Sequence, residues 1–485
     1  DRQYSLGVDQ VMILKSIDNS SALFPVQGIL NSNSTYNPPM HSWLYLITNQ
    51  IFYFDLSLVM LIPALLLHWL ASLSLFSLGY RYISPMFGYL CGISYVVAGR
   101  ADYYATATWA QAILPALYSI FLYFAIKWIL ENKNYGFILA ILVGAYAFGL
   151  HLSGILIIAT FIFLCVIFRE LPPLLSFVKA GLLSILLFVP FLIFELDRNW
   201  EDIVTLFNQE GGSGSSRLLP PTSFIAWGME FYMRFVKFFL FNLEKGLLSY
   251  NGILPLIEYY FLAFLFCIGF IFCLYQCLKN NREKDLFFEK VVIVFLAVLL
   301  FLHNLTPYNP AVRLDLVMPY FPFVIIFCAY GIWRSSLLLE NRNWKIVTVS
   351  LFIFIPVLSY LSAFPTKWRT DDWKKEFVKP IFQLAKKNNL QSLNIGYCDN
   401  IKDKFNRIFS KQRRVDENYY PGLSYDFYLD RVFGIKNEND PNRQYDVIVL
   451  YQKSYGKEFD AYEKLYSMGD YDDSLLILSD KRLLY

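Results

Sequence analysis

The chain has 485 residues, of which 56% are hydrophobic and 19% aromatic, and its mean hydropathy is +0.40. Only 17% of the residues are charged, below the share of about a quarter that soluble domains carry. This composition excludes a purely water-soluble chain, and a net charge of +3 without a basic patch argues against a nucleic-acid partner.

Apolar runs of near span length recur along the chain and predict ten transmembrane helices. The predicted spans are residues 56–78, 84–99, 106–129, 135–150, 152–168, 174–194, 257–277, 291–304, 314–333 and 346–363. A run of about 20 apolar residues is long enough to cross the hydrocarbon core of a bilayer. We therefore expect a multi-pass α-helical membrane protein.

The short connections between these spans alternate between basic and nearly uncharged. One set of connections carries Arg81, Lys127, Lys133, Arg169, Lys279, Arg282, Lys284, Lys290, Arg334, Arg342 and Lys345. The positive-inside bias makes this set cytoplasmic, so residues 1–55, the loop 195–256 and the tail lie on the outer face. Because residues 1–55 would then start outside, they need either a preceding span or a cleaved signal, and an eleventh span fits best.

The tail changes character and predicts a small α/β domain. The stretch that begins "TKWRTDDWKKEFVKPIFQLAKK" reads as an amphipathic helix and is followed by the strand-like "NIGYCD". Two further strands are predicted in "YDVIVLY" (445–451) and "SLLILSD" (474–480). About 120 residues suffice for a separate core.

We therefore divide the chain into three parts. Residues 1–55 form a first outer loop with interfacial helices, 56–364 form the transmembrane domain, and 365–485 form the extracytoplasmic α/β domain. Within the long outer loop 195–256, the Gly/Ser-rich stretch "NQEGGSGSSRLLPPTSF" is either a plain linker or a flap near a substrate entrance.

Ionisable and polar residues near the outer face are few, and the topology sets them at one depth. The candidates for a functional site are Asp9, Asn37, His41, Arg100, Asp102, Tyr103, His151 and Arg313. Charged groups at a membrane boundary are costly unless they face a polar cavity, so a shared cavity is predicted. The seven cysteines show neither a disulfide framework nor metal-ligand spacing.

Each candidate also has a plain structural interpretation. Arg100 or Arg313 can extend to lipid headgroups, and Asp102 can cap the helix that follows it. Asp9 resists such an interpretation, because its apolar neighbours in "LGVDQVMIL" imply a buried carboxylate, which is costly without a role. His68 and His303 lie within apolar runs and are interpreted as packing residues.

The order of short motifs along the chain resembles that of a known family. "GVDQ", then "LFP", then "YNPPMHSWLYL" resembles the N-terminal signature of the C-fold (GT-C) membrane glycosyltransferases. The pattern is most similar to the lipid A aminoarabinose transferases and the protein O-mannosyltransferases. "GRADYYATATW", "HLSGILI" and "VRLDLVMPYFPFVIIF" resemble later segments of that family, so the resemblance covers most of residues 1–364.

The resemblance implies roles for residues near the N-terminus. Asp9 matches the acid that ends the family's first span, and the Pro38–Pro39 corner sets an interfacial helix beside the active-site cavity. Trp43 and Tyr45 would then anchor this helix at headgroup depth.

Two positions depart from the family pattern. The family's second acid is Gln10 here, and the lysine that precedes the proline pair is Asn37. Arg100, Arg313 or His151 would therefore have to bind the donor phosphate, and an Arg suits that task.

The implied function is transfer of a sugar from a polyprenyl-phosphate carrier to an acceptor outside the membrane. Asp9 would act as general base, with inversion at the sugar, and Asp102 would orient the acceptor or hold Arg100. No essential metal or other cofactor is expected, although a divalent metal stays open. The partners would be the lipid-linked donor and an acceptor lipid, protein or glycan, in a bacterial plasma membrane.

Two other classes of function are compatible with such a chain. A lipid or lipid-linked-sugar transporter or flippase would also carry intramembrane charges, but no internal repeat of the kind common in transporters is visible. A scaffold subunit would not explain a buried carboxylate at Asp9.

Overall fold

The structure is a computed structural model. It describes residues 13–14, 16–18, 25–26, 28, 36–53, 56–97, 110–151, 154–201, 204, 253–279, 287–305, 319–339, 343, 346–347, 349–351, 354, 371–393, 395–398, 436–438, 446–451, 462–468, 475–480 and 483. The chain divides into two compact units. The first comprises Asp1–Asn19, Asn49–Val59 and Lys367–Tyr485, and the second comprises Ser20–Thr48 and Met60–Thr366.

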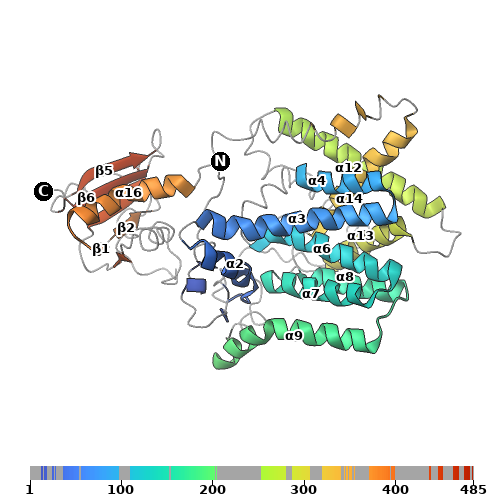
Figure 1. Cartoon of the computed structure of the whole chain (residues 1–485), viewed down its shortest axis with the longest axis horizontal. Coiled ribbons are helices and arrows are strands. Elements are labelled where there is room, and N and C mark those ends of the chain that lie inside the picture. The colour runs from blue at the N-terminus through green and yellow to red at the C-terminus, as the bar shows by residue number, and fades with distance from the viewer. Residues whose placement is uncertain are drawn as a thin grey trace, which may run out of the picture. The chain divides into compact units, whose positions relative to one another are not determined.

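The second unit is a bundle of apolar helices (Figure 1). In chain order its helices are α2 (Met40–Ile51), α3 (Leu56–Tyr82), α4 (Pro85–Val97), α6 (Ala110–Glu131), α7 (Asn134–Leu150), α8 (Gly154–Ile167), α9 (Leu174–Asp197), α12 (Ile253–Lys279), α13 (Phe288–Leu305) and α14 (Phe321–Leu338). The first residues of α3 and the last residues of α2 belong to the first unit.

Nine of the ten predicted spans coincide with a helix among the described residues, from α3 and α4 through α14. In the tenth, 346–363, the described residues are helical and the others lie outside the described part of the chain. Within the described residues, four helices are long and apolar enough to cross a membrane: Leu58–Tyr82, Ala112–Glu131, Leu174–Asp197 and Phe321–Leu338. The prediction of a multi-pass helical membrane protein is confirmed.

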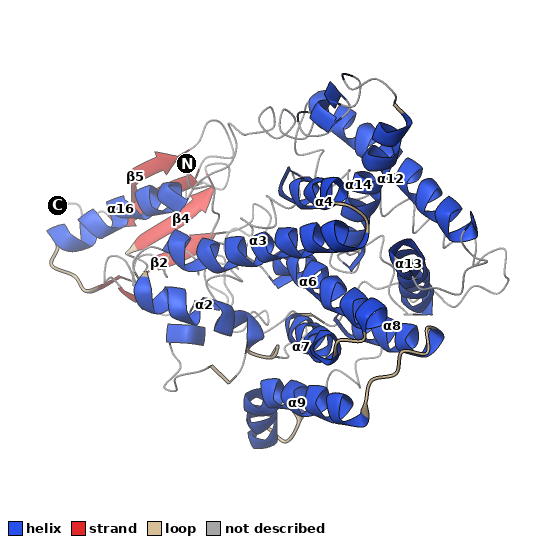
Figure 2. Ribbon diagram, turned by 45° about the vertical axis from the view of Figure 1, so that its right-hand side comes forward, coloured by secondary structure: helices blue, strands red, loops and turns tan. Residues whose placement is uncertain are grey.

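Close helix crossings hold the bundle together. Among the described helices, α12 and α14 form the most extensive of these contacts (Figures 1 and 2). A Cβ atom built on Gly269 of α12 would lie 1.8 Å from the backbone oxygen of Phe327. A Cβ on Gly331 of α14 would lie 2.3 Å from the backbone oxygen of Leu265. Because glycine has no Cβ at either position, the two helix backbones can come into direct contact, as at other membrane helix contacts.

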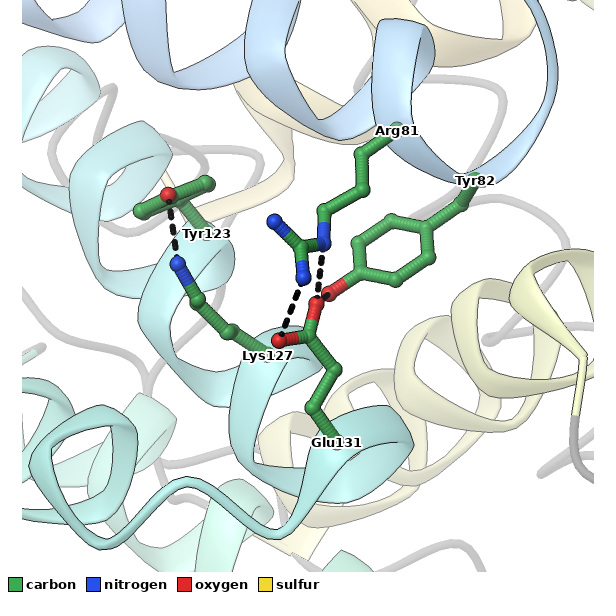
Figure 3. Close-up of polar contacts among 5 residues, drawn as sticks. All are labelled: Arg81, Tyr82, Tyr123, Lys127 and Glu131. Atoms are coloured by element: carbon green, nitrogen blue, oxygen red, sulfur yellow. Dashed lines mark hydrogen bonds and ion pairs between the residues drawn. The ribbon is translucent and has the colours of Figure 1, made fainter.

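A polar cluster joins α3 to α6 at the end where both helices approach the predicted cytoplasmic face (Figure 3). Arg81 donates to Glu131 (Nη2 to Oε2, 3.0 Å), and Tyr82 donates to the same carboxylate. Lys127 donates from Nζ to the hydroxyl of Tyr123 at 3.1 Å. Two of the basic residues that indicate orientation thus also make contacts within and between helices.

The first unit contains the α/β part of the chain. Helix α16 (Asp371–Lys387) precedes a two-stranded sheet of β1 (Ser392–Leu393) and β3 (Lys436–Asn437) and a four-stranded sheet. The larger sheet has the order β2-β4-β6-β5, with β2 (Ile395–Cys398), β4 (Val447–Tyr451), β6 (Leu475–Asp480) and β5 (Tyr462–Met468). β2 runs parallel to β4, and the β4–β6 and β6–β5 pairs are antiparallel.

The amphipathic helix and all three predicted strands of the tail are confirmed by α16, β2, β4 and β6. Strand β5 was not predicted. Its sequence, "YEKLYSM", lacks the apolar run of β4, which lies in the middle of the sheet. Among the described strands, β5 pairs only with β6 and lies at the edge of the sheet, where polar and charged residues are common. The outer location of this unit and the domain boundaries stay predictions.

Candidate functional site

Three of the predicted site residues lie in the described part of the chain: Asn37, His41 and His151. The other five, Asp9, Arg100, Asp102, Tyr103 and Arg313, lie outside the described residues. These three residues come from two segments of the sequence. Asn37 and His41 lie in one, and His151 lies in another more than one hundred positions later. The structure brings these segments together where α2 begins and α7 ends.

The proline pair forms a fixed corner that leads directly into α2. The backbone N–H of Gly28 donates to the oxygen of Asn37 at 2.7 Å, and Trp43 N donates to the oxygen of Pro39 at 3.1 Å. The indole Nε1 of Trp43 donates to the oxygen of Pro25 at 2.9 Å. Because the prolines restrict φ and these bonds hold both sides, α2 starts at Met40 in a defined direction. A helix therefore follows the proline corner, and its predicted interfacial position beside an active-site cavity stays a prediction.

The start of α2 is attached to the end of α7. The Tyr146 hydroxyl donates to the backbone oxygen of Met40 at 2.6 Å. A Cβ on Gly149 would lie 2.5 Å from the Met40 sulfur, so the Met40 side chain packs directly against the backbone at Gly149. His41 follows Met40, and His151 is the C-cap of α7. His41 and His151 therefore belong to the same junction.

His41 points into the protein, where it is only 5% exposed. The Tyr45 hydroxyl lies 3.4 Å from His41 Nε2, and their ring centroids are 5.4 Å apart. Tyr45 is fully buried, and burial raises its pKa well above the usual value, with a smaller effect from Tyr146. The prediction that Tyr45 anchors the helix at headgroup depth is wrong, because the ring is enclosed by protein. A role of His41 in binding substrate stays a prediction.

The last turn of α9 packs on the same junction and was missed in the sequence. The Tyr36 ring meets the edge of Phe194 at 5.5 Å, and the Arg198 guanidinium lies over both rings at 5.0 and 5.2 Å. Glu195, in the same turn, is fully buried. The signal was present in "FELDRNW", where charged residues end an apolar span at the predicted outer face.

Two histidines outside this junction are packing residues, as predicted for His68. Its Nε2 lies 3.2 Å from the oxygen of Ala112, and the Tyr95 hydroxyl lies 2.8 Å from its Nδ1. His303 stacks on Tyr320, whose hydroxyl lies 2.6 Å from Nδ1. Neither belongs to the α2–α7 junction. No cluster of three or more His, Cys, Asp or Glu that could hold a metal ion occurs among the described residues.

Comparison with known proteins identifies the fold. No protein family and no curated protein matches the sequence. Among solved structures, ArnT (a lipid A aminoarabinose transferase) from Cupriavidus metallidurans bound to undecaprenyl phosphate matches with a TM-score of 0.61 and 11% identity, over 100% of this chain and 95% of that chain. Apo ArnT gives 0.59 and 10% identity with the same coverage.

The chain therefore has the C-fold of membrane glycosyltransferases, which confirms the fold predicted from the motifs. A third structure, the apo oligosaccharyltransferase from Archaeoglobus fulgidus, matches with a TM-score of 0.47 and 11% identity, over 89% of this chain and 61% of that chain. At such identities the similarity concerns the fold, and the chemistry has to be argued from the residues.

Proposed function

We propose that the protein is an integral membrane glycosyltransferase that moves a sugar from a polyprenyl-phosphate carrier to an acceptor on the extracytoplasmic face. The observation that carries this proposal is the match to ArnT over the whole chain, since one ArnT structure is bound to undecaprenyl phosphate. The acceptor would be a lipid, a protein or a glycan.

The proposed reaction is a direct displacement at the anomeric carbon. Asp9 takes the proton of the acceptor hydroxyl as its oxygen attacks, and the carrier phosphate leaves with the electron pair of the glycosidic bond. With one carboxylate and no covalent intermediate, the configuration at the sugar inverts. Asp102 orients the acceptor or holds Arg100.

Cationic and polar residues would stabilise the leaving phosphate. Arg100 and Arg313 are suited to this role, because a guanidinium binds a phosphate through two parallel hydrogen bonds. His151, His41, Asn37 and Tyr103 would line the same site. A monophosphate leaving group needs no metal in this scheme, and the proposed donor is a substrate, not a cofactor.

The junction of α2 with α7 supports the proposal through its rigidity. Bonds from Gly28, Trp43 and Tyr146 hold the chain on both sides of Asn37, so this segment is positioned before any substrate binds. Such preorganisation lowers the entropic cost of reaching a reactive geometry. The α/β part of the tail would cover the cavity or select the acceptor.

The proposal is tested by following label from carrier to product. Purified wild type, Asp9→Asn and Asp18→Asn would be incubated with membrane lipid extract that contains radiolabelled polyprenyl-phosphate sugars. Asp18 provides a matched control, because it is exposed and accepts a hydrogen bond from Asn49 Nδ2 at 3.2 Å. Thermal melting would confirm that all three proteins are folded.

We expect wild type and Asp18→Asn to transfer label and Asp9→Asn to lose at least about a hundredfold in rate, the lower range for a general base. If Asp9→Asn matches wild type, the base assignment is wrong and Asp102 becomes the next residue to test. If wild type moves no label from any carrier, the transferase proposal is refuted, and lipid-linked-sugar transport would be assayed in its place.

A further inference from the structure

Helix α9 is the most exposed of the four span-length apolar helices in the described part of the chain, yet it buries a carboxylate. Only 11% of its apolar window is covered by protein, as expected for a helix that faces lipid. Its four buried residues are Ser176, Ala180, Phe191 and Glu195. Glu195 is completely buried, although most of the helix around it is open. This placement is costly for an ionisable group and calls for a specific environment.

The face of α9 that carries Glu195 is the face that packs on α7. Phe188 lies seven residues before Glu195, which is nearly two full turns, so the two side chains share one face. The Phe188 ring contacts Phe148 of α7, with centroids 5.8 Å apart. Figures 1 and 2 show α7 and α9 side by side. Seven residues add about 10 Å along the axis, whereas α7 ends only two residues after Phe148, so Glu195 lies past the end of α7.

The neighbours of Glu195 in the last turn of α9 meet the segment before the proline corner. Phe194 contacts Tyr36, and the Arg198 guanidinium lies over the Tyr36 ring. Tyr36 directly precedes Asn37. The last turn of α9, which carries Glu195, thus contacts the segment that leads into Asn37 and α2, from a third element of the bundle.

The charge of Glu195 indicates which part of a lipid-linked sugar it would meet. A carboxylate repels a phosphate but accepts hydrogen bonds from hydroxyl groups, and charge-assisted bonds of this kind are about twice as strong as neutral ones. Burial strengthens them further, because the surrounding dielectric is low. The part of the donor that carries several hydroxyl groups is the sugar ring.

We propose that Glu195 is a sugar-binding residue of this protein, whose carboxylate accepts hydrogen bonds from ring hydroxyls of the donor. This inference rests on the proposed glycosyltransferase function. It adds an acid that comes from α9 to the polar residues already proposed for the site.

The inference is tested by comparing ligands with and without the sugar. Wild type, Glu195→Gln, Glu195→Asp and Asp197→Asn would be purified as the full chain, and binding would be measured by ligand-induced thermal stabilisation. The probes are undecaprenyl phosphate and a panel of undecaprenyl-phosphate hexoses and pentoses. Asp197→Asn is the matched control, since Asp197 lies in the same turn but is exposed.

We expect Glu195→Gln to bind undecaprenyl phosphate as wild type does but to bind the preferred sugar-bearing lipid at least about tenfold more weakly. Glu195→Asp keeps the charge and should recover part of this loss, and Asp197→Asn should match wild type. An unchanged preference of Glu195→Gln for the sugar-bearing lipid would overturn the inference, and a lower melting temperature without ligand would then mark Glu195 as a packing residue. If wild type binds neither probe, the proposed function fails, and the inference fails with it.

Discussion

The crossing of α12 and α14 offers the sharpest test of the packing described here. We predict that Gly269→Ala destabilises the protein, although alanine is the better helix former. The added Cβ would lie 1.8 Å from the backbone oxygen of Phe327, whereas real contacts of this kind essentially never fall below 3.0 Å. Because a backbone oxygen cannot rotate away as a side chain can, the two helices have to separate.

The expected magnitude combines two opposing effects. In an exposed helix, replacing glycine by alanine favours folding by about 1 kcal/mol. Overpacking a close contact costs about 1–3 kcal/mol, and the cost is at the upper end when backbone must move. Separating α12 from α14 also loosens the contacts of Phe327 with Phe266 and Phe270, whose ring centroids lie at 5.3 and 5.5 Å. We therefore expect a net loss of about 2 kcal/mol or more.

The assay measures the fraction of detergent-solubilised protein that stays monodisperse after heating to a series of temperatures. The midpoint of this curve is the apparent melting temperature. Gly181→Ala is the matched control, because a Cβ at Gly181 in the exposed helix α9 meets nothing within 4 Å. We expect Gly269→Ala to melt about 4 °C or more below wild type and Gly181→Ala to melt at or slightly above it.

The reciprocal substitution sharpens the test. A Cβ on Gly331 would meet the backbone oxygen of Leu265 at 2.3 Å, so Gly331→Ala should also lower the melting temperature. In the double variant the first alanine has already separated the helices. The loss of stability in the double variant should therefore be smaller than the sum of the two single losses. A Gly269→Ala variant that melts at or above wild type would refute the close crossing and the reasoning built on it.

Three further predictions concern single contacts. Glu131→Gln removes the charge that pairs with half-exposed Arg81, and we expect the free energy of unfolding to fall by about 1 kcal/mol at most. This loss should disappear in about 1 M salt, and a loss that persists there would contradict an ionic origin. Tyr146→Phe deletes the bond to the Met40 oxygen, so amide hydrogen exchange in α2 should accelerate by about fivefold, while exchange in α14 serves as the unchanged reference. Burial raises the pKa of Tyr45, so the folded state keeps a proton that the unfolded chain loses, and wild-type stability should fall as the pH rises above about 10. Tyr45→Phe should remove that part of the decline in melting temperature, and an identical pH dependence in both proteins would argue against a buried phenol.

Much of the fold was predictable because apolar run length reports directly on span length. Nine predicted spans coincide with helices, and their ends differ by only a few residues for α7 and α8. The central strands β4 and β6 were also predictable, since buried strands carry continuous apolar sequence. The edge strand β5 was not, because its polar residues give no such signal and only its pairing with β6 makes it a strand.

The site was predictable only in part. The proline pair predicted a fixed corner next to Asn37, because the restriction of φ is a property of the proline residues themselves. The burial of Tyr45 was misjudged, because an aromatic residue near a span end is equally compatible with headgroups and with a protein interior. Glu195 was missed because nothing local distinguishes it from Asp197, two positions away, which is exposed.

The sequence by itself determined the class of the protein, the approximate limits of the described helices from α3 to α14, the stiff corner before α2 and the order of motifs typical of the C-fold. These features depend on properties of short segments: hydrophobicity, proline geometry and charge. Only the tertiary structure decided which helices touch, that α7 and α9 meet the corner from two sides, and that Glu195 is buried while its neighbours are not. Such facts depend on contacts between segments far apart in the chain, and no local pattern encodes them.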